Sequence, residues 1–526
     1  MSFILHSLKI KPDKIKLIML RTKYILPIFV IISAVLGLLR FSSLQLGTSY
    51  DDAHYIILAE SLSSGQGYEL INFPNPQVER AFPPGWPILL TPLTFLFPGN
   101  YAVLKLLSLA LWLASIFLIY NIFSRRIESP YLEIVTGLAA LNPLLVGTSV
   151  TVMAESAYLF FSLLALNLFD SLHESKKNWL IVLVAVFALF TQLIRTIGIS
   201  LVIALIFYFL LTRRWREAGI TATVFIAGAL LQIGLNLRNG GSVVSAGYQS
   251  QVFSGSVAEK IEQMSSNMLG YFNEILAGAL VPIFSSRVTA FLENYGLGSL
   301  AAITNIIILA VIVLGFVMSI RRMHITDLYF VVYVLGILAF WNPNVGSVKA
   351  RFLIPIIPFL YFYLMEGILW VKEKVTRNGI NYGRRIEAVV VGFMMLALLV
   401  RNLQDWRNPI MNQMTDISIG TSWVAENAPP DSIVMVNEPV PAYVHVQRKT
   451  IGYPKADRDF VSYLNNQGID YIVVAPELQS PRSTELGENV STYILPILNS
   501  QADKFIMVFQ NNEHNVSVYE YLDGDE

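Results

Sequence analysis

The chain contains no cysteine, and charged residues make up only 14% of its 526 residues. The lack of cysteine excludes disulfide bonds and thiolate chemistry within the chain. Its 37 basic and 37 acidic residues balance to a net charge of zero, which gives no sign of a nucleic-acid partner. Neither a glycine-rich phosphate loop nor a spacing typical of zinc ligands is present. The chemistry of the protein therefore has to be sought among a small number of charged residues.

Long apolar runs dominate the sequence instead. Hydrophobic residues account for 54% of the chain, and they gather in runs of roughly 16 to 23 residues, the length of a transmembrane helix. The first run follows a basic stretch and lacks a small-residue cleavage site, so we expect it to remain as an anchor. The runs predict a polytopic α-helical membrane protein with about 11 transmembrane helices, at 24–40, 101–123, 131–150, 154–171, 179–194, 197–212, 218–237, 299–319, 326–341, 352–371 and 386–402.

The distribution of Lys and Arg predicts the orientation. Basic residues accumulate in segment 1–23 and in every second connection after it, namely Lys9, Lys11, Lys14, Lys16, Arg21, Lys23, Arg125, Arg126, Lys176, Lys177, Arg213, Arg214, Arg216, Arg321, Arg322, Lys372, Lys374, Arg377, Arg384 and Arg385. Cytoplasmic loops carry such an excess. We therefore expect a cytoplasmic N-terminus, a domain over 24–402 in a plasma or inner membrane, and residues 403–526 in an external or periplasmic domain.

Two of the predicted external loops are long, and long loops usually carry function. The loop 41–100 contains a predicted amphipathic helix, Asp52–Ser63, whose apolar face holds Tyr55, Leu58, Ala59 and Leu62. It also contains an apolar piece, Trp86–Phe97, that is too short to span a bilayer and should lie in the membrane interface. The loop 238–298 is rich in Gly and Ser around Tyr248, which favours a mobile flap or substrate lid.

The composition changes after residue 402. Strand-like runs at Ile433–Asn437, Tyr471–Ala475 and Phe505–Phe509 alternate with helical stretches near 458–467 and 489–498. Turn signals separate these runs. They predict a small external α/β domain.

Three carboxylates are candidates for chemistry. Asp51 and Asp52 are adjacent at the start of the predicted loop helix, and Glu155 stands at the external mouth between the third and fourth spans. Each could simply favour a helix N-terminus, by capping or through the helix dipole. Paired carboxylates beside a membrane also shift each other's pKa, as acid/base catalysis requires. Because Asp51 and Glu155 should lie at the same membrane depth, we expect them to converge on one cavity.

Cations on the same side form the third element. Arg195, Arg238, Lys349 and Arg351 all stand at external ends of predicted spans. Lys and Arg at helix ends commonly snorkel to the interface. Four cations at one depth, facing paired carboxylates, also suit the binding of a phosphate or diphosphate headgroup.

These residues resemble the GT-C glycosyltransferases, in particular the family 39-like group of protein O-mannosyltransferases and aminoarabinose transferases. The resemblance covers about residues 20–400. It is carried by Asp51, Asp52, Tyr55, Ala59, Leu62, Gly65, Gly67 and Tyr68, by Pro83-Pro-Gly-Trp-Pro87, by Glu155, by Leu193-Ile-Arg195 with Gly198, and by Arg351-Phe-Leu353 with Pro355 and Pro358.

The resemblance implies a GT-C-like fold and transfer of a sugar from a polyprenyl-phosphate donor on the outer face of the membrane. It implies that Asp51 is the general base or orients the acceptor, that Asp52 supports it, and that Glu155 matches a further acidic position. Arg195 and Arg351 match residues near the lipid phosphate. Lys349 and Arg238 are further candidates for phosphate binding because they also stand at external ends of predicted spans. His54, Tyr55 and Tyr248 are candidates for acceptor contact, although His54 alone also suits an ordinary helix face.

Such transfer would join the sugar, with inversion, to a hydroxyl of a protein, lipid or glycan. No cofactor is required, and a divalent metal is conceivable but not indicated. The alternatives are a polytopic transporter, an enzyme of the same fold such as a ligase or oligosaccharyltransferase, and a scaffold whose external domain carries the function. Transporters usually show internal repeats and charges at the bilayer midplane, neither of which is evident in this sequence.

Overall fold

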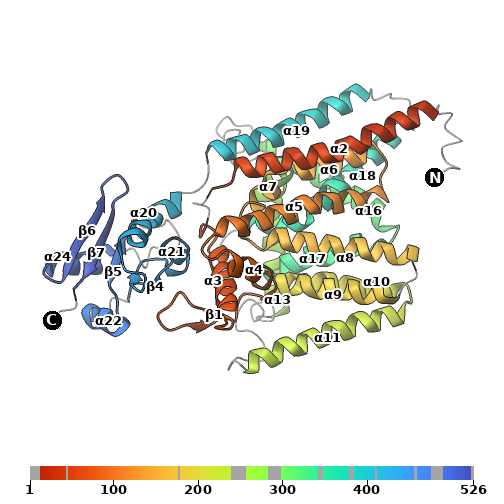
Figure 1. Ribbon diagram of the computed structural model, residues 1–526. Helices are drawn as coiled ribbons and strands as arrows, with labels where there is room; N and C mark the ends of the chain where they lie inside the picture. Colours follow the sequence, from red (N-terminus) through yellow and green to blue (C-terminus); the bar gives the residue numbers. More distant parts are fainter. Residues whose placement is uncertain are drawn as a thin grey trace. The chain divides into compact units, whose positions relative to one another are not determined.

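The computed structural model describes residues 12–42, 46–175, 178–238, 256–281, 298–341, 348–377, 384–408, 412–454, 459–475 and 490–522. The chain divides into two compact units (Figure 1). The first comprises residues 1–41, 107–150 and 154–408, and the second comprises 42–106, 151–153 and 409–526. The second unit thus groups the first long loop with the C-terminal segment, which was not predicted from the sequence.

The first unit is helical, and most of its helices lie on the predicted apolar runs, whereas those between Val257 and Leu280 lie inside the predicted loop 238–298. The helices of this unit are α2 (Pro12–Leu39), α5 (Tyr101–Ser124, starting in the second unit), α6 (Tyr131–Ala140), α7 (Pro143–Thr148), α8 (Glu155–Ser175), α9 (Asn178–Ile194), η2 (Thr196–Gly198), α10 (Ile199–Leu211), α11 (Trp215–Arg238), α13 (Val257–Gly270), the π-helix η3 (Tyr271–Ile275), α14 (Leu276–Leu280), α16 (Gly298–Ile320), α17 (Ile325–Phe340), η6 (Ala350–Ile356), α18 (Ile357–Arg377) and α19 (Arg384–Arg407).

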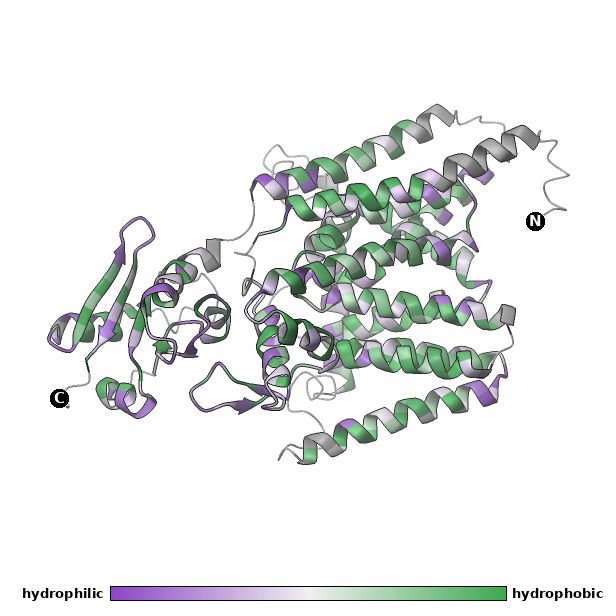
Figure 2. Cartoon of the chain, viewed as in Figure 1, coloured by the Kyte–Doolittle hydropathy of each residue, from purple (hydrophilic) through white to green (hydrophobic). Residues whose placement is uncertain are grey.

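Four helical stretches of the described chain are long and apolar enough to cross a membrane: Tyr101–Ser124, Trp215–Gly234, Ala350–Thr376 and Val389–Arg407. The other apolar helices are shorter, at 10–17 residues. Figure 2 shows that hydrophobic residues run along most of the length of these helices. The prediction of a polytopic helical membrane protein is confirmed.

The predicted third span, 131–150, is two helices and not one. Helix α6 ends before Asn142, and Pro143 begins α7. Proline suits the first position of a helix because its missing N–H would have no partner there. The side-chain oxygen of Asn142 accepts hydrogen bonds from the amides of Leu144 and Leu145 at 3.0 and 3.3 Å. This cap and proline explain the break in an otherwise apolar run.

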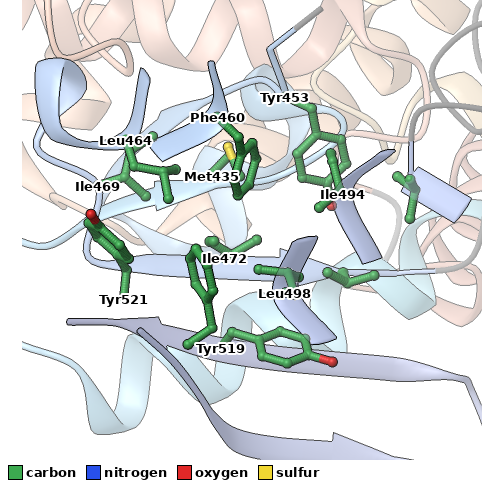
Figure 3. Close-up of a cluster of buried hydrophobic side chains, with 13 residues drawn as sticks. Met435, Tyr453, Phe460, Leu464, Ile469, Ile472, Ile494, Leu498, Tyr519 and Tyr521 are labelled. Atoms are coloured by element: carbon green, nitrogen blue, oxygen red, sulfur yellow. The ribbon is translucent and has the colours of Figure 1, made fainter. Parts of the chain in front are cut away.

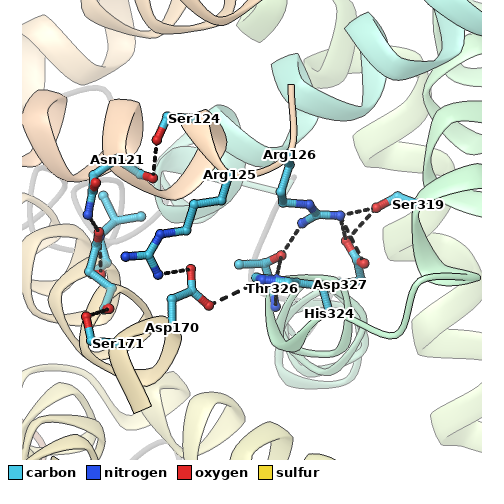
Figure 4. A network of polar contacts seen from close by, with 12 residues as sticks. Asn121, Ser124, Arg125, Arg126, Asp170, Ser171, Ser319, His324, Thr326 and Asp327 are labelled. Carbon is cyan, nitrogen blue, oxygen red and sulfur yellow. Dashed lines mark hydrogen bonds and ion pairs between the residues drawn. The ribbon is translucent and has the colours of Figure 1, made fainter. Parts of the chain in front are cut away.

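A buried ionic network joins α16, α17 and α18 to the end of α5 (Figure 4). Arg126 donates to both carboxylate oxygens of Asp327 at 2.8 and 3.1 Å, and also to the hydroxyls of Ser319 and Thr326. Tyr363 donates to the same Asp327 carboxylate at 2.8 Å. The side chains of Arg126 and Asp327 are only 5% and 1% exposed. Such a pair is sustained by its hydrogen bonds, since burying an unpaired charge is costly.

The second unit contains α3 (Asp51–Ser63), α4 (Gly85–Leu96), a short antiparallel hairpin and a five-stranded sheet. The hairpin is β1 (Glu69–Leu70) with β2 (Gln77–Val78). The sheet has the order β4-β3-β5-β7-β6, and the three strands β4, β3 and β5 are parallel whereas β7 is antiparallel to β5 and β6. Its elements are α20 (Asn412–Asn427), β3 (Ile433–Met435), α21 (Pro439–Val446), β4 (Lys449–Ile451), α22 (Phe460–Gln467), β5 (Tyr471–Val474), η7 (Val490–Ile494), α24 (Leu495–Ser500), β6 (Phe505–Asn511) and β7 (Val516–Tyr521).

Alternation along the strands builds a core on each face of this sheet, because successive strand side chains point to opposite faces. Val434 and Val473 pack with residues of α20 and α21. Met435 and Ile472 pack on the other face with α22 and α24, as Figure 3 shows. The predicted α/β domain is confirmed, although the sequence did not predict β4, β7, α20 or α21.

The loop helix α3 differs from its predicted amphipathic character. All residues from Asp52 to Ala59 are buried, and not only one face. The reason is that α4, α21 and β1 all pack against α3. The C-terminal segment is also bonded directly to the first loop, since the Thr450 amide donates to the Asn72 carbonyl at 2.6 Å.

Candidate active site

The diacidic pair opens α3 in the second unit. Tyr50 and not an aspartate is the N-cap residue, and Asp51 and Asp52 occupy the first turn, where the helix dipole favours negative charge. Asp51 is half-buried, whereas Asp52 is 1% exposed. The Oδ2 atom of Asp52 accepts a hydrogen bond from the Gly47 amide at 2.9 Å. Its Oδ1 atom is buried and has no hydrogen-bond partner among the described residues.

Burial sets the protonation behaviour of Asp52. The pKa of its carboxyl is raised to about 7, mainly by removal from water and also by the nearby Asp51 charge, while hydrogen bonds from backbone amides oppose the rise. Lys105, which is 1% exposed, lies within electrostatic range of Asp52 and donates from Nζ to the Ser42 carbonyl at 2.5 Å. Lys105 was missed, although a single lysine within an apolar run is the kind of residue that marks a functional site.

His54 and Tyr55 form an aromatic cluster with Phe82. The His54 ring stacks on Phe82 with centroids 4.5 Å apart, and Tyr55 meets Phe82 edge-on at 5.4 Å. His54 Nδ1 lies 3.1 Å from the Tyr50 carbonyl oxygen, and burial lowers the pKa of its imidazole. Both side chains are buried. These contacts hold the first turns of α3 against the segment that precedes α4.

Glu155 begins α8 in the first unit and pairs with Arg195. The Glu155 Oε1 atom accepts a hydrogen bond from the Arg195 guanidinium, and Oε2 is buried without a hydrogen-bond partner in the described part of the chain. Arg195 has an extended backbone just before η2. The tight turn that presents it requires Gly198, because a Cβ atom there would lie 2.4 Å from the Thr191 carbonyl carbon.

Three of the four predicted phosphate-binding cations gather around two aromatic rings. The guanidinium carbons of Arg195 and Arg351 lie 5.6 and 5.4 Å from the centroid of Phe352. The Lys349 ammonium lies 5.9 Å from the ring of Trp341, which is itself 5.5 Å from Phe352. We refer to Arg195, Arg351 and Lys349 with these two rings as the cationic cluster. A cation over an aromatic face is attracted by the ring, and this attraction helps to hold the three side chains in place.

Two tyrosines beside this cluster were not predicted. Tyr333 donates to the Phe352 carbonyl at 2.8 Å. Tyr271, in the π-helix η3, is 7% exposed, and its hydroxyl has no hydrogen-bond partner among the residues described. It lies within electrostatic range of Arg195. Single-turn π-helices often occur at functional sites, but nothing in the sequence predicts this one.

Two predicted residues cannot be placed. Arg238 ends α11, but its side chain lies outside the described residues, and so does Tyr248. The diacidic pair and Glu155 belong to different units, so their convergence on one cavity stays a prediction. Within the described ranges, no group of three or more His, Asp or Glu side chains is arranged to hold a metal ion.

Similarity to solved structures identifies the fold. ArnT from Cupriavidus metallidurans, bound to undecaprenyl phosphate, aligns with 94% of this chain and 98% of its own length, at 12% identity and a TM-score of 0.56. The oligosaccharyltransferase AglB from Archaeoglobus fulgidus, in complex with an inhibitory peptide and a dolichol-phosphate, aligns with 86% of this chain and 70% of its own, at 14% identity and a TM-score of 0.52. The chain has a GT-C fold. No protein-family model matches the sequence, and no curated protein matches it significantly. The GT-C fold confirms the architecture implied by the sequence motifs.

Proposed function

We propose that this GT-C protein is a membrane glycosyltransferase that moves a sugar from a polyprenyl-phosphate donor to a hydroxyl of a protein, lipid or glycan. The observation that carries the proposal is the cationic cluster beside the buried Glu155–Arg195 pair. Arginine matches phosphate geometry, and ring-stacked guanidinium groups are already oriented for it. The fold supports the same donor class, since the AglB and ArnT structures contain dolichol-phosphate and undecaprenyl phosphate.

The cationic cluster would act on the leaving group. As the bond between the sugar C1 and the phosphate oxygen breaks, the electron pair leaves with the polyprenyl phosphate and adds negative charge to it. Arg195, Arg351 and Lys349 would stabilise this charge most strongly in a water-poor site. Arg238 remains a proposed fourth member on its sequence position alone.

Asp51 would be the general base. The acceptor hydroxyl attacks C1 from the face opposite the phosphate, its oxygen forms the new bond, and its proton passes to the Asp51 carboxylate. Adjacent carboxyls whose environments separate their pKa values can take different roles. Asp52 is buried with a raised pKa, whereas Asp51 is only half-buried, which favours Asp51 as the carboxylate that meets the acceptor. Single displacement of this kind inverts the configuration at C1.

Purified protein in liposomes tests the proposal directly. It should consume one of a panel of polyprenyl-phosphate hexoses and pentoses, and mass spectrometry should find the sugar on a protein, lipid or glycan acceptor. Asp51→Asn should abolish transfer, whereas Asp416→Asn, a matched change at a 26% exposed aspartate of the C-terminal domain, should not. Full transfer by Asp51→Asn would exclude the base, and absence of transfer from every donor would exclude the function.

The proposal also places the reaction on the outer face, with the N-terminus in the cytoplasm. The absence of cysteine makes single-cysteine labelling possible in the otherwise unchanged protein. Ser462→Cys on α22 and Ser124→Cys at the end of α5 are both at exposed positions. A membrane-impermeant maleimide added to intact cells should label Ser462→Cys and not Ser124→Cys. The reverse pattern would contradict the orientation.

A further inference from the structure

One peptide group connects the C-terminal segment to the diacidic pair. The carbonyl oxygen of Leu46 and the amide of Gly47 belong to the same peptide. His445 Nε2 lies 3.0 Å from that carbonyl oxygen, and the amide donates to Asp52 Oδ2 at 2.9 Å. Because a peptide group is planar and rigid, fixing its carbonyl end also fixes the direction of its N–H. All four residues lie in the second unit.

The state of His445 follows from its partner. A carbonyl oxygen can only accept, so Nε2 must carry the hydrogen. Burial lowers the pKa of the His445 imidazole, which keeps the ring neutral near pH 7 as the Nε2–H tautomer. His445 lies in the last turn of α21, and α21 packs directly on α3. Gly47 has a φ of 83°, a left-handed conformation that suits glycine.

We infer that His445 is a positioning residue for the diacidic pair, acting through the Leu46–Gly47 peptide on Asp52. The inference rests on the proposed function of that pair and adds to it a role for the C-terminal segment. Hydrogen bonds in a chain polarise one another, so a donor on the carbonyl strengthens the N–H that Asp52 accepts. A hydrogen bond to the carboxylate favours its ionised form.

Other titratable groups around α3 are separate from this connection. Asp51 and Lys105 act on Asp52 through their charges. Glu60, further along α3, bonds to Tyr101 on α5 and to Tyr443 on α21. His54 has Glu79 and Asp51 as its charged neighbours. Among these described groups, His445 is the one whose side chain bonds to the Leu46–Gly47 peptide, which in turn donates to Asp52.

Two conservative variants separate positioning from packing. In His445→Gln the side-chain amide nitrogen can occupy the place of Nε2, whereas in His445→Asn it is too short to reach the carbonyl. The readout is the pH midpoint of the infrared band of protonated Asp52, assigned by difference from Asp52→Asn. We expect His445→Asn to move the midpoint upward by about one pH unit and to slow sugar transfer roughly tenfold. His445→Gln should retain the wild-type midpoint and rate.

His514→Asn is the matched control, because His514 bonds to Asp416 at 2.9 Å within the same C-terminal segment. It should leave the Asp52 midpoint unchanged. An unchanged midpoint in His445→Asn, or an equal shift in His445→Gln or His514→Asn, would overturn the inference. The infrared measurement needs no sugar donor, so a shift without any transferase activity would count against the proposed function and not against the positioning role.

Discussion

Glu155 and Arg195 form an ion pair in which the carboxylate side chain is 1% exposed and the guanidinium is 17% exposed. A charge pair this deep is costly to maintain for stability alone. The pair also leaves Glu155 Oε2 without a partner in the described residues. The Arg195 guanidinium joins the cationic cluster by lying over the Phe352 ring. We propose that Glu155 orients Arg195 within the cluster and keeps one oxygen for a substrate group.

Substitution of either partner should reduce sugar transfer with different kinetic effects. Arg195→Lys keeps the charge but loses the planar fork, so we expect KM for the lipid-phosphate donor to rise. Glu155→Gln should lower kcat by roughly 10²-fold, the order seen when a preorganised group is lost. Steady-state kinetics with varied donor concentration measure both. Arg214→Lys is the control, because Arg214 also pairs with a carboxylate, Glu217 on α11, at a more exposed position. Equal losses in all three variants would contradict specific roles.

Apolar periodicity and local turn chemistry were enough to predict most of the fold. The apolar runs became helices because their length and composition leave few alternatives. The predicted third span is broken at Asn142–Pro143, where the capping Asn and the Pro mark the start of a new helix. A prediction based on the length of the apolar run overlooked these two residues. Strand β4 was missed because a strand as short as Lys449–Ile451 acquires its identity from pairing with its neighbours and not from its own composition. Strand β7 (Val516–Tyr521) was missed although its six residues are rich in Val and Tyr, as is typical of a strand.

The candidate site was predictable only in part. Asp52, Glu155 and Arg195 stood out because charge is rare in the predicted external loops. Lys105, Tyr271 and His445 did not, since their importance depends on what the fold brings next to them. The hydrogen bond from His445 joins residues 399 positions apart in the chain, and no pattern in one sequence reports such a contact.

Asp52→Asn should change how stability depends on pH. Burial raises the pKa of Asp52 from its ordinary 3.8 to about 7, so the fold disfavours the ionised form. The contribution of Asp52 to stability is thus fully present below pH 4 and declines as the pH rises to 7, by up to about 4 kcal/mol. Asn can still accept from the Gly47 amide but carries no charge. The variant should therefore melt above the wild type at pH 8, and this advantage should vanish at pH 4. A difference in melting temperature that is the same at both pH values would contradict the raised pKa.

Arg126→Ala should be far more destabilising than Arg125→Ala. It would leave the buried Asp327 carboxylate unpaired, at a cost of about 3–5 kcal/mol. Arg125 is 29% exposed, and its partner Asp170 also contacts His324 at 3.3 Å. Arg125→Ala should therefore cost no more than about 1 kcal/mol. Thermal unfolding in detergent, followed by tryptophan fluorescence, compares the two. Similar melting temperatures for both variants would show that the Arg126 network contributes little to stability.

Tyr271→Phe should affect substrate binding without affecting the fold. The Tyr271 hydroxyl is buried beside Arg195 and has no partner in the described chain, so its removal breaks no hydrogen bond seen in the structure. If this hydroxyl donates to the substrate, KM for the lipid-phosphate donor should rise about tenfold, since a hydrogen bond to a charged group contributes about 1.5–3 kcal/mol. Tyr361→Phe is the matched control, because the Tyr361 hydroxyl bonds to the Leu280 carbonyl at 2.7 Å and to the Asn142 amide at 3.0 Å. That variant should lower the melting temperature and leave KM unchanged. A Tyr271→Phe protein with wild-type KM would show that its hydroxyl does not contact the donor, whereas a large loss of stability would assign it a structural partner instead.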